Sequence, residues 1–497
     1  PAFTFLYGDP HAHMMALPIT LLALIWAVSF IRHQWQGHFG NRKEIIISGA
    51  ITLAGGAWIV GMLKPTNTWD YYTYLVICCL AILFTGVKQL HNYKLNSIDK
   101  YKQWIILAAS IGFFIILSAL LFKPFSHWYG QAYTKIMFWQ GDNSPLGSYL
   151  IHWGYLLFII STWYIWETRN WMAATPLSSL KKLYPYRSIG YLGLILMATM
   201  LVVLLFMGVS IAIIVIPLGI WTVILLLRSG QDEIKRFVLF LIGTGLTLTL
   251  VVELVVIEGD IGRMNTVFKF YLQAWTMLSI GGAAGLIWSV QSIMDEWLSR
   301  WRTAWLIPMI LLTGSVMLFP LLATTDKIND RISDDAPHTL DGMAFMPHST
   351  YFENGVDMDL SQDYAAIQWM QDNVTGSPVI VEANIPEYRW GSRFSIYTGL
   401  PGVVGWNWHQ RQQRAISNSN QVFERVAAVG EFYQTKDLIS TENFLMKFDV
   451  SYIVVGQLEK ITYTAEGLSK FAEWDGALWE PVYQDKQTSI YRVIKEQ

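Results

Sequence analysis

Charged residues are scarce in this chain. Asp, Glu, Lys and Arg make up only 14% of its 497 residues, whereas hydrophobic residues make up 53%. Soluble globular domains carry roughly 25% charged residues. This deficit excludes an ordinary soluble protein, and we expect the chain to be embedded in a membrane over much of its length.

Cysteine is nearly absent as well. The two cysteines, Cys78 and Cys79, are neighbours within an apolar run, so neither a disulfide framework nor a zinc site of the cysteine type is available. A concentrated basic surface is also missing, because 35 Lys and Arg residues stand against 37 Asp and Glu residues. Proteins that bind nucleic acid need such a surface, and we therefore predict no nucleic-acid partner.

The near-neutral total hides two parts of opposite charge. Residues 1–324 contain 21 Lys and Arg against 13 Asp and Glu, and residues 325–497 contain 14 against 24. In the second part, helical patterns at 361–374, 421–435 and 441–448 alternate with buried strand patterns at 378–382 and 451–456, which is typical of an α/β domain. We predict a transmembrane helical bundle over 1–324 and an extracytoplasmic α/β domain over 325–497.

Long apolar runs in the first part predict about ten transmembrane helices. A crossing of a hydrocarbon core about 30 Å thick needs about 20 apolar residues. Such windows lie near 14–31, 45–63, 71–90, 104–122, 148–166, 188–207, 209–227, 236–257, 271–291 and 303–323. The uncharged stretch 188–227 is too long for one crossing, so we predict a hairpin that turns near Gly208 and Ser210.

The basic residues predict the orientation of this bundle. Lys and Arg accumulate in short cytoplasmic loops. The loops after the odd-numbered spans carry 16 of these residues and the loops on the opposite face carry five. We therefore expect the N-terminus and the acidic domain on the outer face of the membrane.

Ionisable residues gather in two segments of that outer face. Asp9, His11 and His13 form a D-x-H-x-H pattern that suits a divalent cation or a base with its orienting partner, although wetted interfacial residues are an equal alternative. Asp70 follows at the start of a span, where capping the helix is as good an explanation as catalysis.

The densest cluster lies around residues 253–269. Glu253 is a carboxylate inside an apolar run, which by default is a functional-site hypothesis. Near it, Glu258 and Asp260 suit general-base chemistry, and Arg263 and Lys269 can clamp a phosphate. Asn265 shares a helix face with Lys269 and is a further candidate for binding the substrate. The alternative is an ion-pair network that neutralises itself and holds the turn.

A third candidate lies in the acidic domain, in the segment 398–414. Its aromatic and basic side chains suit a sugar or an anionic headgroup, because rings stack on sugar faces and Arg forks grip anions. The residues concerned are Trp406, His409 and Arg414. A structural loop with its Trp residues in the core is an equal alternative.

Several segments resemble the signature blocks of the YYY family of uncharacterised prokaryotic membrane proteins. They are GDPHAHMMALP (8–18), NTWDYYTYL (67–75), GDIGRMNTVFKFYLQAW (259–275), TLDGMAFM (339–346), TGLPGVVGWNWHQRQQR (398–414) and SYIVVGQLEKITY (451–463). The blocks occur in order over nearly the whole chain. Members of the family generally carry further spans before the first block, so the resemblance implies the C-terminal portion of a longer protein in a prokaryotic plasma membrane.

The architecture of that family is similar to GT-C glycosyltransferases, which take a sugar from a polyprenyl-phosphate carrier. By this analogy, Asp9, Asp70, Glu258 or Asp260 is the base, and His11, His13, Arg263 and Lys269 bind the phosphate. Fold analogy is an associational argument. It predicts that the outer-face residues converge on one cavity.

A non-catalytic subunit of a larger membrane assembly is the competing hypothesis, and it predicts apolar helices that pack on partner proteins. Transport ranks last, because the spans offer few polar residues at mid-depth.

Overall fold

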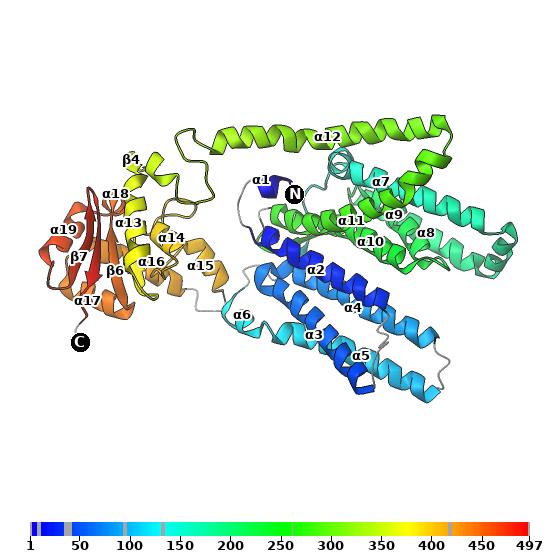
Figure 1. The fold of residues 1–497 in the computed structure, drawn as a ribbon, viewed down its shortest axis with the longest axis horizontal. Helices are drawn as coiled ribbons and strands as arrows, with labels where there is room; N and C mark the ends of the chain where they lie inside the picture. Colours follow the sequence, from blue (N-terminus) through cyan, green and yellow to red (C-terminus); the bar gives the residue numbers. More distant parts are fainter. Residues whose placement is uncertain are drawn as a thin grey trace. The chain divides into compact units, whose positions relative to one another are not determined.

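The computed structural model describes residues 2–6, 11–33, 42–92, 97–130, 135–260, 262–415 and 420–495. The chain divides into two compact units (Figure 1). The first comprises Pro1–Phe125 with Tyr133–Lys327, and the second comprises Ser126–Ala132 with Ile328–Gln497.

The first unit is almost entirely helical. Its elements, in chain order, are α1 (Ala2–Leu6), α2 (Ala12–His33), α3 (Arg42–Thr66), α4 (Thr68–Asn92), α5 (Ser97–Leu120), α6 (Lys123–Trp128), β1 (Ile136–Phe138), α7 (Leu146–Ala174), a 3₁₀ segment η1 (Leu177–Tyr186), α8 (Arg187–Phe206), α9 (Ala212–Leu227), α10 (Glu233–Leu254), β2 (Val255–Ile257), α11 (Met264–Glu296) and α12 (Ser299–Arg331). The last residues of α6 and of α12 belong to the second unit.

Seven helices in the described part of the chain are long and apolar enough to cross a membrane: α2, α3, α4, α5, α10, α11 and α12. All ten predicted windows fall on helices, yet three of these helices fail those criteria. α8 and α9 hold apolar stretches of only 10–17 residues, and α7 is rich in Trp and Tyr. Seven of the ten predicted spans are thus candidate crossings by length and apolarity within the described ranges, and the chain is a polytopic membrane protein.

The predicted hairpin is confirmed. α8 ends at Phe206 and α9 begins at Ala212, with Gly208 between them at φ +83°. That left-handed conformation is cheap only for glycine, so Gly208 sets the turn.

The core of the bundle consists of two groups of helices (Figure 1). One hydrophobic cluster joins α2, α3, α4 and α5, and a second joins α7, α8, α9, α10 and α11. α10 and α11 contribute to both clusters, through Phe237, Leu241 and Met277 on the first side. This pair of helices therefore links the two groups.

Glycines allow α10 and α11 to pack closely. A Cβ atom added to Gly281 would lie 2.3 Å from Cγ1 of Ile242, and one added to Gly245 would lie 2.8 Å from Cγ of Leu278. Membrane helices associate through small residues of this kind, because lipid tails are as apolar as the side chains.

The second unit combines small sheets with short helices. Its elements are a 3₁₀ turn η2 (Met346–His348), β3 (Thr350–Glu353), β4 (Val356–Asp359), α13 (Leu360–Asn373), β5 (Val379–Val381), α14 (Arg393–Thr398), α15 (Asn407–Gln413), α16 (Asn420–Gln434), α17 (Leu438–Lys447), β6 (Val450–Val455), α18 (Gln457–Thr462), α19 (Ala465–Glu473), β7 (Trp479–Asp485) and β8 (Thr488–Val493). The main sheet has the order β5-β6-β8-β7, in which only β5 and β6 are parallel.

A buried arginine ties the second unit together. Arg393 is 1% exposed, and its Nε lies 2.7 Å from Asp363 Oδ2 while Nη2 lies 2.9 Å from Glu459 Oε2. Glu382 lies at 3.6 Å. Burial alone would raise the pKa of Glu459, but the guanidinium and two backbone N–H donors outweigh it and hold that pKa below its usual value. The network joins α13, α14 and α18 to the end of β5.

Candidate functional site

The turn between α10 and α11 is braced by a two-stranded sheet. β2 pairs antiparallel with β1, and the Glu258 N–H extends the pairing by donating to the Lys135 carbonyl over 2.9 Å. α10 therefore ends at Leu254, three residues before the end of the predicted span. This places the backbone of 255–260 in a fixed position beside α11.

A buried ion pair lies next to this sheet. The Glu253 side chain is fully buried, and its Oε2 lies 3.0 Å from Nη1 of Arg263. Ser144 donates to the same carboxylate from its N–H over 2.8 Å and from its hydroxyl over 2.7 Å. Arg263 also donates to the Ser144 hydroxyl oxygen and to the Val252 carbonyl, over 3.0 and 2.9 Å. Both charges are satisfied within the protein, as a buried pair requires.

The other acids of the turn also have local contacts. Asp260 accepts from the N–H groups of Asn265 and Thr266, over 3.1 and 2.8 Å, at the start of α11. It thereby caps that helix. Glu258 is half-exposed and lies 3.4 Å from the Lys135 ammonium. The binding roles predicted for Asn265 and Arg263 stay predictions.

The N-terminal ends of three long helices meet at this end of the bundle. The His13 ring, near the start of α2, lies 4.5 Å from the Phe268 ring on α11. The Lys269 ammonium on α11 lies 5.9 Å from the centre of the Trp69 ring at the start of α4. Helix N-termini carry partial positive charge, so three together with a lysine favour an anion.

Asp70 lies in the first turn of α4 at this junction and is 3% exposed. Its Oδ2 accepts a hydrogen bond from Asn67 Nδ2 over 3.0 Å, and the Gln273 side chain of α11 lies nearby and donates to the Trp69 carbonyl over 3.4 Å. Within the described ranges, no Lys, Arg or His pairs with this carboxylate. A carboxylate at membrane depth that lacks a cation is costly, which makes it a functional candidate.

The structure thus places His13, Asp70 and Lys269 near the N-terminal ends of three adjoining helices, and Asp260 interacts electrostatically with Lys269. The His11 ring lies 5.5 Å from the His13 ring. Asp9 lies outside the described residues. Two cavities of about 400 and 550 Å³ in the described part of the chain are lined by other side chains, and the expected convergence on one outward cavity stays a prediction.

A metal centre was a further expectation. Among the residues that the structure describes, no group of three or more His, Cys, Asp or Glu side chains is placed to hold a metal ion. Because Asp9 is not among those residues, the divalent-cation hypothesis for Asp9, His11 and His13 stays a prediction.

The second unit contains an aromatic cluster around Trp406 and His409. Tyr388 Oη lies 2.7 Å from His409 Nε2, and the Trp406 ring lies 5.1 Å from the Tyr388 ring and 5.6 Å from the His409 ring. Tyr388 has φ +64°, a strained conformation for a bulky residue. Arg414 is exposed and contacts the Gln410 side chain at 3.3 Å instead.

Polar atoms beside this cluster lack partners. Trp406 Nε1, Asn407 Oδ1 and Arg411 Nε are buried, and within the described chain they make no hydrogen bond. Glu387 accepts from the Trp408 N–H, and this bond holds the pKa of its carboxyl below the usual value. Neither Glu387 nor Tyr388 was predicted, because they precede the aromatic segment by about 20 positions and carry no motif of their own.

The fold and the placement of polar groups define a polytopic helical membrane protein with a polar junction at one end of its bundle. The model of a family described as uncharacterised membrane protein, DUF2298, matches residues 1–278. This is more than half of the chain, and the chain belongs to that family. No curated protein matches it. His13, Asp70 and Lys269 lie within the matched range, whereas Trp406 and His409 lie outside it.

Proposed function

We propose that this protein is a GT-C-like glycosyltransferase that takes a sugar from a polyprenyl-phosphate carrier. The observation that carries the proposal is the meeting of three helix N-termini around Lys269, His13 and Asp70. A lipid phosphate at a membrane surface needs cationic donors at the boundary and apolar surroundings for its chain. The junction offers both, since α2, α4 and α11 are all candidate spans.

In the proposed reaction, the acceptor hydroxyl attacks the anomeric carbon of the carried sugar. The bond from that carbon to the phosphate oxygen breaks, the acceptor oxygen forms a new bond to the carbon, and polyprenyl phosphate leaves. Asp70 takes the hydroxyl proton as general base. Lys269 and His13 stabilise the charge that develops on the leaving phosphate. Arg263 acts as a positioning residue, because its donors are committed to Glu253, Ser144 and Val252.

The aromatic cluster of the second unit is the proposed recognition site for a carbohydrate. Aromatic rings pack on the apolar faces of sugars, and the unpaired Trp406 Nε1 and Asn407 Oδ1 supply a donor and an acceptor for hydroxyl groups. Each buried polar atom without a partner is costly, and a bound sugar would relieve that cost.

Release of polyprenyl phosphate by the purified full chain tests the reaction. The substrates are a panel of synthetic polyprenyl-phosphate hexoses, with and without simple sugar acceptors. We expect acceptor-dependent release by the wild type, and a loss of at least about 100-fold for Asp70→Asn. Asp99→Asn changes an exposed acid on α5 that lies near Lys102 and serves as the matched control. Equal rates for Asp70→Asn and wild type would refute the assignment.

A non-catalytic role in a membrane assembly is the second candidate, and α12 favours it. This helix has 33 residues, of which only Trp305 is buried, and its apolar window is 0% buried. A helix that buries so little of its apolar surface against the described part of its own chain suits a partner protein. Copurification of a stoichiometric partner that is lost on replacing Leu311 and Leu318 by Ser would support this role.

A further inference from the structure

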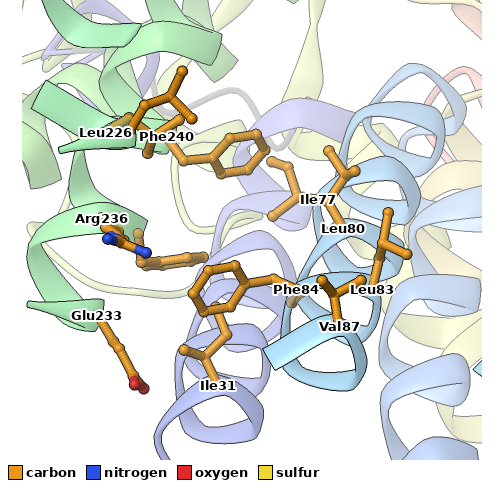
Figure 2. A pocket seen from close by; sticks show the side chains of 13 residues that line it. Ile31, Ile77, Leu80, Leu83, Phe84, Val87, Leu226, Glu233, Arg236 and Phe240 are labelled. Atoms are coloured by element: carbon orange, nitrogen blue, oxygen red, sulfur yellow. The ribbon is translucent and has the colours of Figure 1, made fainter. Parts of the chain in front are cut away.

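A second cluster of polar side chains lies at the opposite end of the bundle, beside an apolar cavity of about 400 Å³ (Figure 2). α2 and α4 begin at the junction described above, and the cavity lies towards their C-terminal ends. Figure 2 shows Ile77, Leu80 and Phe84 of α4 facing Leu226 of α9 and Phe240 of α10. The body of the cavity is therefore apolar.

Among the described residues that line this cavity, only Glu233 and Arg236 are charged, and both lie in the first turns of α10. Glu233 forms an ion pair with Lys88 of α4, so its charge is balanced. Arg236 donates from Nη2 to the Arg228 carbonyl over 2.8 Å, and its buried Nε makes no hydrogen bond to any described residue. In the ranges that the structure describes, no carboxylate pairs with Arg236.

The neighbouring charges do not neutralise Arg236. Glu167 pairs with both Arg228 and Lys235, over 2.9 and 2.8 Å, so one carboxylate already serves two cations. Among the described residues, the carboxylates of Glu167, Asp232 and Glu233 therefore stand against four cations, namely Lys88, Arg228, Lys235 and Arg236. The polar side of the cavity carries excess positive charge.

The depth of the cavity matches that of a lipid headgroup and its chain. Glu233 is the first residue of one candidate span, and Ile31 and Val87 lie within five residues of the ends of two others. The charged side therefore lies at the boundary of the hydrocarbon core. Ile77 and Phe240 lie deeper within their spans, where acyl chains are found.

We infer that this cavity binds an anionic phospholipid, with the phosphodiester against Arg236 and an acyl chain between α4, α9 and α10. The monoanionic phosphate supplies acceptors for the unpaired Nε and balances the excess charge. A basic residue near an anionic surface contributes about 1 kcal/mol. The apolar walls of the cavity bind the acyl chain, which inorganic phosphate lacks, so the lipid should bind more tightly than inorganic phosphate.

Native mass spectrometry of the delipidated full chain tests this inference, with phosphatidylglycerol and phosphatidylcholine as the added lipids. We expect the wild type to prefer phosphatidylglycerol, and Arg236→Gln to lower that preference roughly fivefold. Lys102→Gln removes an exposed cation of α5 outside the cavity and should leave the preference unchanged. Leu80→Trp narrows the cavity and should weaken the binding of both lipids.

Three results would overturn the inference: an unchanged preference in Arg236→Gln, an equal loss in Lys102→Gln, or displacement of the lipid by millimolar inorganic phosphate. The thermal unfolding temperature of each variant shows whether it is folded. Leu80→Trp gives an independent reading even if Arg236→Gln is unstable, because Leu80 is 40% exposed and tolerates a larger side chain. The glycosyl-transfer assay is independent of this result, since it concerns the other end of the bundle.

Discussion

Nη1 of Arg263 lies 3.0 Å from Oε2 of Glu253, and these two side chains are 13% and 0% exposed. The pair connects the end of α10 to the residue that precedes α11, and through Ser144 it also holds the loop before α7. This ion pair fixes the position at which α11 begins, and Asp260 caps the first turn of that helix. The ion pair thereby sets where Lys269 is presented.

Removal of either partner of this pair should destabilise the bundle. Arg263→Met or Glu253→Gln leaves the other charge buried and unpaired, which costs roughly 3–5 kcal/mol. The double variant should recover part of that loss, since no isolated charge remains. Thermal unfolding in detergent measures the effect. An Arg263→Met variant with unchanged stability and no activity would instead make Arg263 a direct ligand of the substrate.

The close approach of α10 and α11 should be sensitive to one methyl group. Gly281→Ala places a Cβ atom 2.3 Å from Ile242 Cγ1, and overpacking of this kind costs typically about 1–3 kcal/mol. Gly314→Ala on α12 is the matched control, because its Cβ would meet nothing within 4 Å. We expect a lower unfolding temperature for Gly281→Ala alone, and equal shifts in the two variants would contradict this packing.

The stability of the second unit should rise in mild alkali. Lys470 is buried, and burial lowers the pKa of its ammonium from 10.5 to about 8. Between these values the unfolded chain binds a proton that the folded unit does not, so the unfolding free energy increases with pH. Pulse proteolysis in urea at pH 8 and 10 measures this slope. Lys470→Met should remove it, and Lys447→Met, at an exposed lysine on α17, should retain it.

We expect the aromatic cluster around Trp406 and His409 to bind the acceptor sugar and to take no part in the chemical step. Trp406→Ala removes a ring that contacts Tyr388 and His409, and it leaves the proposed general base Asp70 unchanged. We expect the KM for the acceptor sugar to rise about tenfold with kcat nearly unchanged. Trp408→Ala, at a residue 47% exposed in the first turn of the helix that Trp406 precedes, is the control. A fall in kcat alone would place the cluster in another role.

Local patterns predicted much of the fold. Apolar runs identify every helix that lines the bundle, and the helix and strand patterns of the tail correspond to α13, β5, α16, α17 and β6. Gly208 marks the hairpin because a single residue controls the turn. Window length alone could not separate crossing helices from short ones, and α7 shows that Trp and Tyr blur this distinction.

Long-range partners could not be predicted in the same way. Arg393 is surrounded by Asp363, Glu382 and Glu459, which are spread over about 100 residues and belong to no motif. Glu253 was singled out as an unusual acid, but its partner Ser144 precedes it by 109 residues. Likewise, the pairing of β1 with β2 depends on a three-residue strand in a loop, which is too short for a periodic pattern.

The central claim is that the junction of α2, α4 and α11 receives a lipid phosphate. A cryo-electron microscopy map of the full chain with a saturating polyprenyl phosphate tests it most directly. We predict phosphate density in contact with Lys269 and His13, next to Asp70. A map in which the phosphate lies only elsewhere, for example against Arg236, with the junction filled by protein side chains alone, would contradict the account.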